Sequence, residues 1–340
     1  MRKVTVVYLA FLLIFGLAGN AFADDLDLFG NTDIKTSKQD NAKNPFAERP
    51  DIRLSAGVGY LQGETSYEIG GHYTSTNPED PEGNLNNPLS ELDWPLNVIM
   101  GSVDLTASYW RLSGALSYKM NFSDPKQKME DSDWLTPSAP GQLDAYSETG
   151  VTLDAKIFDG NLNFAFLKYK GWGMQIGLGY LWQDFSFVAS DGYQWSPSGH
   201  PKVYTGPING RAITYDVTYE IPYAQLLVDF NAKKFRGALA YQYSPFVNAE
   251  DEDHHLLRSK VGKGYDSGYM NAVRFNCTYD FTKHFFGGID LSWRQIETTG
   301  YQRQHQDACA ENGYQEWWGD IDNEIYSEQR ECKLSAGYKF

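Results

Sequence analysis

The sequence predicts an all-β protein, a ten-stranded antiparallel transmembrane β-barrel with long extracellular loops. Three observations predict it: a secretory signal at the N-terminus, long segments whose side chains alternate with a period of two, and 23 Tyr and 9 Trp in 340 residues. Aromatic side chains gather at the two interfaces of membrane barrels. The net charge of -15 argues against a nucleic-acid partner, because such proteins usually present a basic surface.

Residues 1–23 have the features of a secretory signal peptide. Met-Arg-Lys opens the chain, an apolar run follows over residues 4–18, and Ala-Phe-Ala at 21–23 is a small-x-small cleavage site. The apolar run is too short for an anchoring helix. We expect residues 24–50, which are polar and irregular, to form a periplasmic tail or a loose plug, and residues 51–340 to form the barrel.

Alternation of side chains carries the strand prediction. Apolar and polar residues alternate over 213–224, 269–280 and 331–340, which puts one set on each face of a strand. These segments exceed the ~5–6 residues of an average soluble strand. They suit a tilted membrane strand, which needs ~9–11 residues. We expect ten strands at residues 51–69, 90–107, 111–124, 145–160, 171–193, 210–231, 234–250, 267–281, 283–300 and 323–340.

The expected connections alternate in length, as short periplasmic turns and long external loops do in such barrels. The short connections are expected near 108–110, 161–170, 232–233 and 282. The long loops are expected near 70–89, 125–144, 194–209, 251–266 and 301–322. A barrel of this size is filled by its own side chains and makes no wide pore, so the external loops are where we expect the functional residues.

Two acidic runs, E-D-S-D-W and E-D-E-D-H-H, fall at the same, external end of the predicted barrel. If the strands continue into them, alternate residues share a face: Asp131 with Asp133, and Asp251 with Asp253 and His255. An Asp–His pair can turn water into a nucleophile, because the carboxylate orients the imidazole and the imidazole takes the proton. Two neighbouring carboxylates repel, so one of them can hold a proton near neutral pH.

Other interpretations of these runs stay open at this level. Acidic runs in external loops are commonly solvated surface, and acidic loops also bind calcium, although neither run has the full EF-hand spacing. His254-His255 is a candidate transition-metal site. The sequence contains no HExxH, GxSxG or CxxC motif, which disfavours zincins, α/β-hydrolases and thioredoxin-like proteins.

At these residues the sequence resembles the omptins, the outer-membrane endopeptidases of Gram-negative bacteria. Each matching motif is short, but together they occur in order on a matching strand plan over roughly residues 51–340. The motifs are L-D-W at 92–94, M-x-D-x-D-W at 129–134, G-R-A-I at 210–213, Y-S-x-x-V at 243–247, D-x-D-x-H at 251–255 and R-S-K-V at 258–261. The resemblance favours a functional interpretation of both acidic runs.

The resemblance implies an aspartic-type endopeptidase with its active groove at the external end of an outer-membrane barrel. Asp253 and His255 would be the dyad that activates water, and Asp131 and Asp133 would be the facing carboxylate couple. It implies no covalent intermediate, no metal and no cofactor. The substrates implied are peptides or proteins, and the barrel wall would contact outer-membrane lipid.

The family favours substrates with a basic residue before the cut, and an acidic groove would attract such cationic peptides. Asp251 matches one acid of the family's pocket for that side chain. The other pocket acid falls at Tyr67, with Glu64 and Glu68 close by, so a small shift in register would bring one of them into the pocket.

The resemblance also implies activation by lipopolysaccharide through basic residues on the outer wall. The matching positions here are Trp182, Asp184, Thr218 and Gly262, with only Tyr180 kept, and such residues would bind phosphate poorly. The changed wall and pocket favour a competing hypothesis, a non-catalytic outer-membrane adhesin or partner-binding barrel of the same fold.

Overall fold

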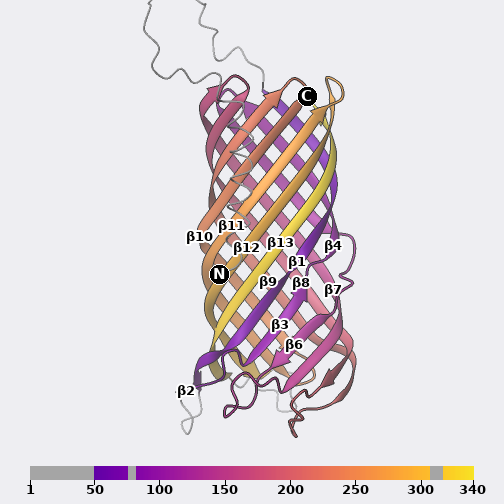
Figure 1. The fold of residues 1–340 in the computed structure, drawn as a ribbon, viewed down its shortest axis with the longest axis vertical. Helices are drawn as coiled ribbons and strands as arrows, with labels where there is room; N and C mark the ends of the chain where they lie inside the picture. The colour runs from indigo at the N-terminus through magenta and orange to yellow at the C-terminus, as the bar shows by residue number, and fades with distance from the viewer. Residues whose placement is uncertain (1–49, 76–81, 307–316) are drawn as a thin grey trace, which may run out of the picture. The chain divides into compact units, whose positions relative to one another are not determined.

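The computed structural model describes residues 50–75, 82–306 and 317–340, and all its regular elements there are β-strands. They join in one antiparallel sheet that closes into a barrel because β1 pairs with β13 (Figure 1). The prediction of an all-β antiparallel fold is therefore confirmed. The strands are β1 (Asp51–Ser75), β2 (Glu82–Asn84), β3 (Ser90–Pro95), β4 (Val98–Tyr109), β5 (Leu112–Asn121), β6 (Met129–Asp133), β7 (Ala145–Tyr169), β8 (Trp172–Trp195), β9 (Gly206–Ala232), β10 (Phe235–His255), β11 (Lys260–Asp280), β12 (Phe285–Gln306) and β13 (Trp317–Lys339).

The period-two pattern of the sequence appears as alternating burial along the strands. On β9, Tyr215, Val217 and Tyr219 are fully buried in the barrel, whereas Asp216 and Glu220, on the opposite face, are exposed. Neighbouring side chains on a strand point to opposite faces, so one set fills the interior and the other forms the wall. No helix in the described ranges is both long and apolar enough to cross a membrane.

Apolar side chains lie exposed on the wall of the barrel half that carries the short turns. Leu178 is 72% exposed, Leu334 61% and Val58 60%. Val58 is the register partner of Leu334 on β13, and Leu162 is that of Leu178 on β8, so the exposed side chains form patches that cross several strands. Extended exposed apolar surface of this kind marks contact with a membrane or another protein.

The number of strands differs from the prediction: ten were expected, and the described residues form a 13-stranded sheet. The predicted strand 90–107 is divided into β3 and β4, β6 falls in the predicted loop 125–144, and β2 falls in the predicted loop 70–89. The division arises because β1 changes partner: it pairs with β4 as far as Leu61 and with β3 from Glu64 onward.

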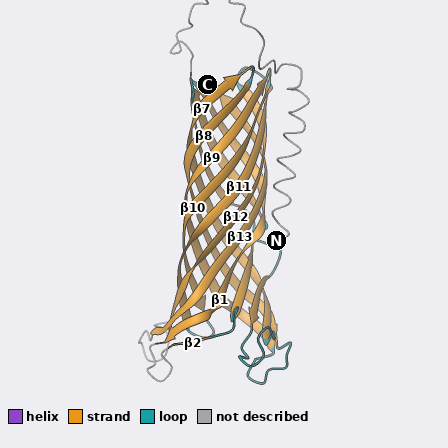
Figure 2. Cartoon of the chain, turned by 60° about the vertical axis from the view of Figure 1, so that its left-hand side comes forward, coloured by secondary structure: helices purple, strands orange, loops and turns teal. Residues whose placement is uncertain are grey.

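Two expected connections are also wrong. The predicted short connection 161–170 belongs mostly to β7, which runs to Tyr169. The predicted long loop 251–266 is mostly strand, because β10 continues to His255 and β11 begins at Lys260, which leaves a turn at residues 256–259. Part of the predicted loop 301–322, residues 307–316, lies outside the described residues. Figure 2 shows the remaining loops gathered at the end of the barrel near β2.

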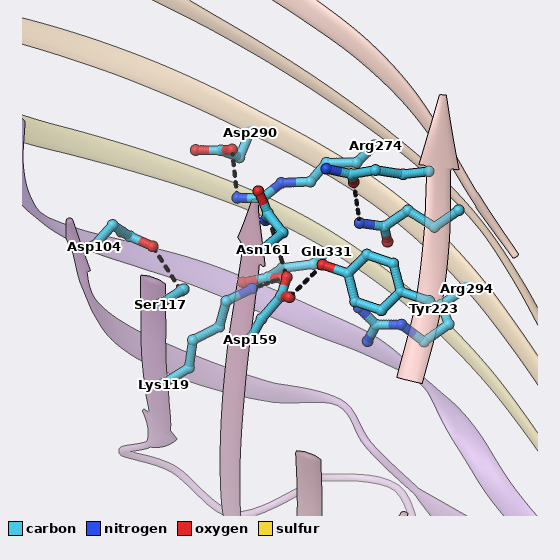
Figure 3. Close-up of polar contacts among 12 residues, drawn as sticks. Asp104, Ser117, Lys119, Asp159, Asn161, Tyr223, Arg274, Asp290, Arg294 and Glu331 are labelled. Carbon is cyan, nitrogen blue, oxygen red and sulfur yellow. Dashed lines mark hydrogen bonds and ion pairs between the residues drawn. The ribbon is translucent and has the colours of Figure 1, made fainter. Parts of the chain in front are cut away.

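A buried polar network fills the interior of the barrel half that contains β4 and β5 (Figure 3). Lys119 forms an ion pair with Glu331, and the Arg274 guanidinium lies 3.2 Å from Asp290 and 3.5 Å from Asp159. An apolar and aromatic core lies next to this network, toward the end of the barrel away from the short turns. On the short-turn side lies a cavity of about 700 Å³. Side chains thus occupy the interior between the two ends, as expected for a small barrel.

Candidate active site

A buried aspartate–histidine pair ends β10. His255 Nε2 lies 2.8 Å from Asp253 Oδ2, and the two residues are only 5% and 1% exposed. They share the inner face because they are two residues apart on one strand. From β1, the Tyr67 hydroxyl donates a hydrogen bond of 2.5 Å to the same Asp253 oxygen. The carboxylate is therefore held from two sides and fixes the orientation of the imidazole ring.

The environment of this pair favours a neutral imidazole beside an ionised carboxylate. Burial lowers the pKa of His255, and the nearby Arg258 charge adds to this, although Asp253 opposes both. Burial would raise the pKa of Asp253, but His255, Lys260 and the Tyr67 hydroxyl together hold that pKa below its ordinary value. A neutral imidazole near pH 7 has the protonation state that a general base requires.

A second pair of acids, Asp131 and Asp133, lies on β6. Asp131 is buried and Asp133 is half-buried. Burial raises the pKa of Asp131 well above its usual range, and the Asp133 charge raises it further. The Asp253 charge also raises the pKa of Asp131, so the two pairs lie within electrostatic reach of each other. Asp131 Oδ1 has no hydrogen-bond partner among the described residues.

Stacked aromatic rings support both pairs from within the barrel. The Tyr215 ring lies 5.0 Å from the Tyr67 ring and 5.3 Å from the Trp94 ring, measured between centroids. Leu92, from the L-D-W motif, is the register partner of both Tyr67 and Asp131. All of these apolar side chains are nearly fully buried. The motif residues on β3 thus build the floor beneath the site.

A third polar group lies deeper in the barrel, beside the dyad. Asn323 Nδ2 donates to Asp266 Oδ2 at 2.8 Å and approaches Asp251 Oδ1 at 3.5 Å. A Cβ at Gly264 would lie 1.7 Å from Asp251 Oδ1, and one at Gly300 would lie 2.7 Å from Asp266 Oδ1, so the two glycines make room for these side chains. We call Asp251, Asp266 and Asn323 the deep acidic cluster.

The deep acidic cluster holds two carboxyl groups in a poorly solvated place. Burial, together with the charges of Asp266 and Asp253, raises the pKa of Asp251 well above its usual range. Burial raises the pKa of Asp266 to about 7. In the described part of the chain, Asp251 Oδ2 and Asp266 Oδ1 accept no hydrogen bond. Such a site favours a cation, because a positive charge would offset the cost of ionising buried acids.

Glu64 and Glu68 do not join Asp251. On β1 the inner face carries Thr65 and Tyr67, both almost fully buried, so Glu64 and Glu68, which flank them, point to the outer wall. Glu68 is the register partner of Glu91 on β3, and partial burial and then the Glu324 charge raise its pKa. The register shift that would have brought one of these glutamates into the pocket does not occur.

The positions that match the family's lipopolysaccharide site do not all lie on the outer wall. Thr218 donates a hydrogen bond of 3.2 Å to Asp184 across β8 and β9. Tyr180 is 40% exposed. Gly262 is buried, and a Cβ there would meet the inward-pointing Gln302, so this position belongs to the interior.

Several site residues had no assigned role in the sequence prediction: Tyr67 as a donor to Asp253, Arg258 and Lys260 beside the dyad, and Asp266 with Asn323. Arg258 and Lys260 belong to the R-S-K-V motif, which contributes to the family resemblance but does not indicate what these two residues do. Asp266 fell in a predicted loop, so its inward direction could not be derived. In the described ranges, no three His, Cys, Asp or Glu side chains converge as a metal site.

Fold and site together define a class of protein: a closed antiparallel barrel with exposed apolar walls and a buried titratable centre at one end. Comparison with known proteins shows which solved structures and which family this class corresponds to. The outer membrane protease OmpT from Escherichia coli has the same fold, with a TM-score of 0.67 and 19% identity over 85% of this chain and 97% of that chain.

The chain belongs to the omptin family, whose model matches residues 48–338. It is 27% identical over 270 residues to the outer membrane protease OmpP of Escherichia coli strain K12, which covers 76% of this chain and 82% of that protein. Protease 7 of Escherichia coli O157:H7 is 26% identical over 231 residues, or 61% of this chain and 69% of that protein. The predicted family and the predicted outer-membrane location in a Gram-negative bacterium are confirmed.

Proposed function

We propose that this chain is an outer-membrane endopeptidase that cleaves peptides or proteins with water activated by Asp253 and His255. The observation that carries the proposal is the buried 2.8 Å contact between these two side chains, with Asp131 of the acid couple within electrostatic reach of Asp253. The protease names of its relatives support the reaction class.

In this mechanism water attacks the scissile carbonyl carbon while His255 accepts a proton from it. Asp253 stabilises the resulting imidazolium, as carboxylates do in Asp–His pairs. Asp131 and Asp133 share one proton, because neighbouring buried carboxyls cannot both ionise easily, and that proton stabilises the developing oxyanion. The imidazolium then protonates the leaving amine. The enzyme forms no bond to the substrate, and no cofactor takes part.

We further propose that the substrate carries a basic side chain next to the cut. The deep acidic cluster supports this, because Asp251 and Asp266 are buried near the dyad and no described basic side chain forms an ion pair with them. A lysine or arginine side chain of the substrate would supply the charge that the cluster favours.

We also propose that the exposed apolar half of the wall contacts lipid and that the site end faces outside. β3 with β4, and β5 with β6, would each act as one interrupted strand, which gives ten crossing positions around the barrel. Outer-membrane lipid is then a partner of the wall. Lipopolysaccharide is a candidate activator, although the acidic side chain of Asp184 disfavours binding of its phosphate groups.

The test is a cleavage assay on the mature chain refolded in detergent, with and without lipopolysaccharide. Quenched fluorescent peptides would carry Arg-Arg, Lys-Lys, Ala-Arg or uncharged central pairs. We expect cleavage beside the basic residues and a loss of about 10³-fold or more in His255→Ala, because the general base is removed. Electrophoretic mobility before and after heating would check that both proteins are folded.

Cleavage of uncharged peptides at the same rate would keep the mechanism and remove the basic preference. A folded barrel that cleaves none of the peptides would instead favour the alternative function, a non-catalytic adhesin or partner-binding barrel.

A further inference from the structure

Both ring nitrogens of His255 are engaged by side chains of this chain. Nε2 lies 2.8 Å from Asp253 Oδ2, and Nδ1 lies 2.7 Å from an Arg258 guanidinium nitrogen, Nη2. In the proposed mechanism one of these nitrogens must accept a proton from water. We propose that Arg258 is a gating residue, which occupies the proton-accepting nitrogen of His255 and must withdraw before water can be activated; this rests on the proposed function.

The assignment of protons follows from the partners. A guanidinium has only donors, so Nδ1 of His255 accepts a hydrogen bond from Arg258. In the neutral ring the proton then resides on Nε2, from which it is donated to Asp253. The Nδ1 lone pair is the position that remains for a proton from water. Arg258 and the nucleophilic water therefore compete for one lone pair.

The turn that carries Arg258 lets its side chain leave without disturbing the strands. The backbone is held on both sides, since Leu256 N donates to Ala212 O at 2.9 Å and Arg258 N donates to His255 O at 3.0 Å. Arg258 itself is exposed, whereas His255 is buried. Rotation of an exposed side chain takes nanoseconds and costs no backbone contact.

The contact between Arg258 and His255 affects the pKa of His255. Burial and Arg258 lower the pKa of His255, and Asp253 raises it. Lys260 is a second basic group beside the ring, and its charge also lowers the pKa of His255. Charged and titratable groups act on His255 or Asp253 from every side: Arg258 from the turn, Lys260 from β11, Asp131 from β6, Asp251 from β10, Tyr67 from β1 and Tyr215 from β9.

The test compares kcat/KM against pH for the wild type, Arg258→Ala and Arg258→Lys on one basic peptide. Leu257→Ala, at an exposed neighbour in the same turn, is the matched control. We expect Arg258→Ala to raise kcat/KM about tenfold, because a charge-assisted hydrogen bond no longer competes with water. Its acidic limb should move up by about one pH unit, because the pKa of His255 rises when a nearby positive charge is removed. Arg258→Lys should keep the limb low.

A second measurement does not depend on cleavage. Nitrogen NMR of ¹⁵N-histidine protein in detergent, assigned with His255→Gln, reports each ring nitrogen. We expect an unprotonated, hydrogen-bonded Nδ1 in the wild type and a shift of that signal in Arg258→Ala. Slower cleavage by Arg258→Ala with an unmoved acidic limb, or an unchanged Nδ1 signal, would overturn the gate while leaving the proposed function intact. If the wild type and every variant cleave no peptide, the proposed function fails, and the gate fails with it.

Discussion

Asp266 is a buried acid on β11 that faces another buried acid, Asp251, through the shared amide of Asn323. Two carboxyls in such a place repel and are poorly hydrated, so at least one stays protonated until a cation arrives. If the substrate carries a basic side chain as proposed, the cluster would therefore tie the selection of that substrate to the ionisation of its own carboxyl groups. Because the pKa of Asp266 is raised to about 7, that coupling falls in the range where cleavage would be measured.

We expect the preference for basic over uncharged peptides to grow as pH rises through about 7, because ionised Asp266 attracts the cation and its neutral form does not. In Asp266→Asn the preference should fall about tenfold or more and lose this pH dependence. The ratio of kcat/KM for matched Arg-Arg and uncharged peptides from pH 5.5 to 8.5 measures it. Glu68→Gln, which removes a charge from the outer wall, is the control and should change nothing; a loss there equal to that in Asp266→Asn would contradict the assignment.

Single residues were predictable from the sequence where alternation was unbroken. The D-x-D-x-H pattern put Asp251, Asp253 and His255 on one face, and the structure has them there. Alternation could not tell Tyr67 from Glu64 and Glu68, because that choice depends on the register near Gly63. The contact between Arg258 and His255 is set by the conformation of a turn, which period-two reasoning does not reach.

At the scale of elements, β1 is the strand that changes its pairing partner along its length, from β4 to β3. Gly63 has a φ of +137°, which side chains of L-residues rarely adopt, and Leu96 N donates to Gly63 O at 2.9 Å between β3 and β4. A Cβ at Gly63 would lie 1.8 Å from the Glu328 carbonyl oxygen of β13. This glycine therefore lets β1 change partners while it stays paired with β13.

We expect Gly63→Ala to destabilise the barrel by about 1–3 kcal/mol from backbone strain, with further loss from the clash with β13. The midpoint of urea unfolding in lipid vesicles measures it. Gly141→Ala is the matched control: its φ is also positive, +82°, but nothing lies within 4 Å of its Cβ position. Equal midpoints for the two variants would show that the close approach to β13 contributes nothing.

Most strands were predictable because their period-two pattern is long, but their ends and interruptions were not. Only Pro95, which has no N–H to donate, marks the end of β3 in the sequence. The end of the β10–β11 hairpin is predicted as a loop because its charged residues resemble solvated surface. Alternate members of this run, Asp251, Asp253 and His255, are instead buried inside the barrel, and Asp251 pairs in register with Gly264 across the two strands.

At the scale of the whole molecule, buried ion pairs and aromatic rings together fill the barrel. Lys119 and Glu331 are 212 residues apart in the sequence, and each side chain is only 11% exposed. Taking one charge away from such a pair leaves the other poorly compensated, whereas replacing both by apolar groups restores a packed interior. The pair is thus a sensitive test of how the interior is stabilised.

We expect Lys119→Ala to lower the free energy of unfolding by about 3–5 kcal/mol, the usual cost of breaking a buried pair. The double variant Lys119→Met with Glu331→Leu should recover most of it. Urea unfolding in lipid, followed by tryptophan fluorescence, measures both. If the double variant is no more stable than the single one, packing and not the unpaired charge explains the loss.

The filled interior also bears on how a product of the proposed reaction would leave. The aromatic core and the polar network lie between the site and the cavity at the short-turn end, so they close the interior of the barrel to a cleaved fragment. If the chain cleaves peptides as proposed, both halves of a cut peptide would leave by the end of the barrel at which the peptide bound. The half that kept its basic side chain in the deep acidic cluster would then compete with the next substrate, and turnover would depend on how quickly that fragment is released.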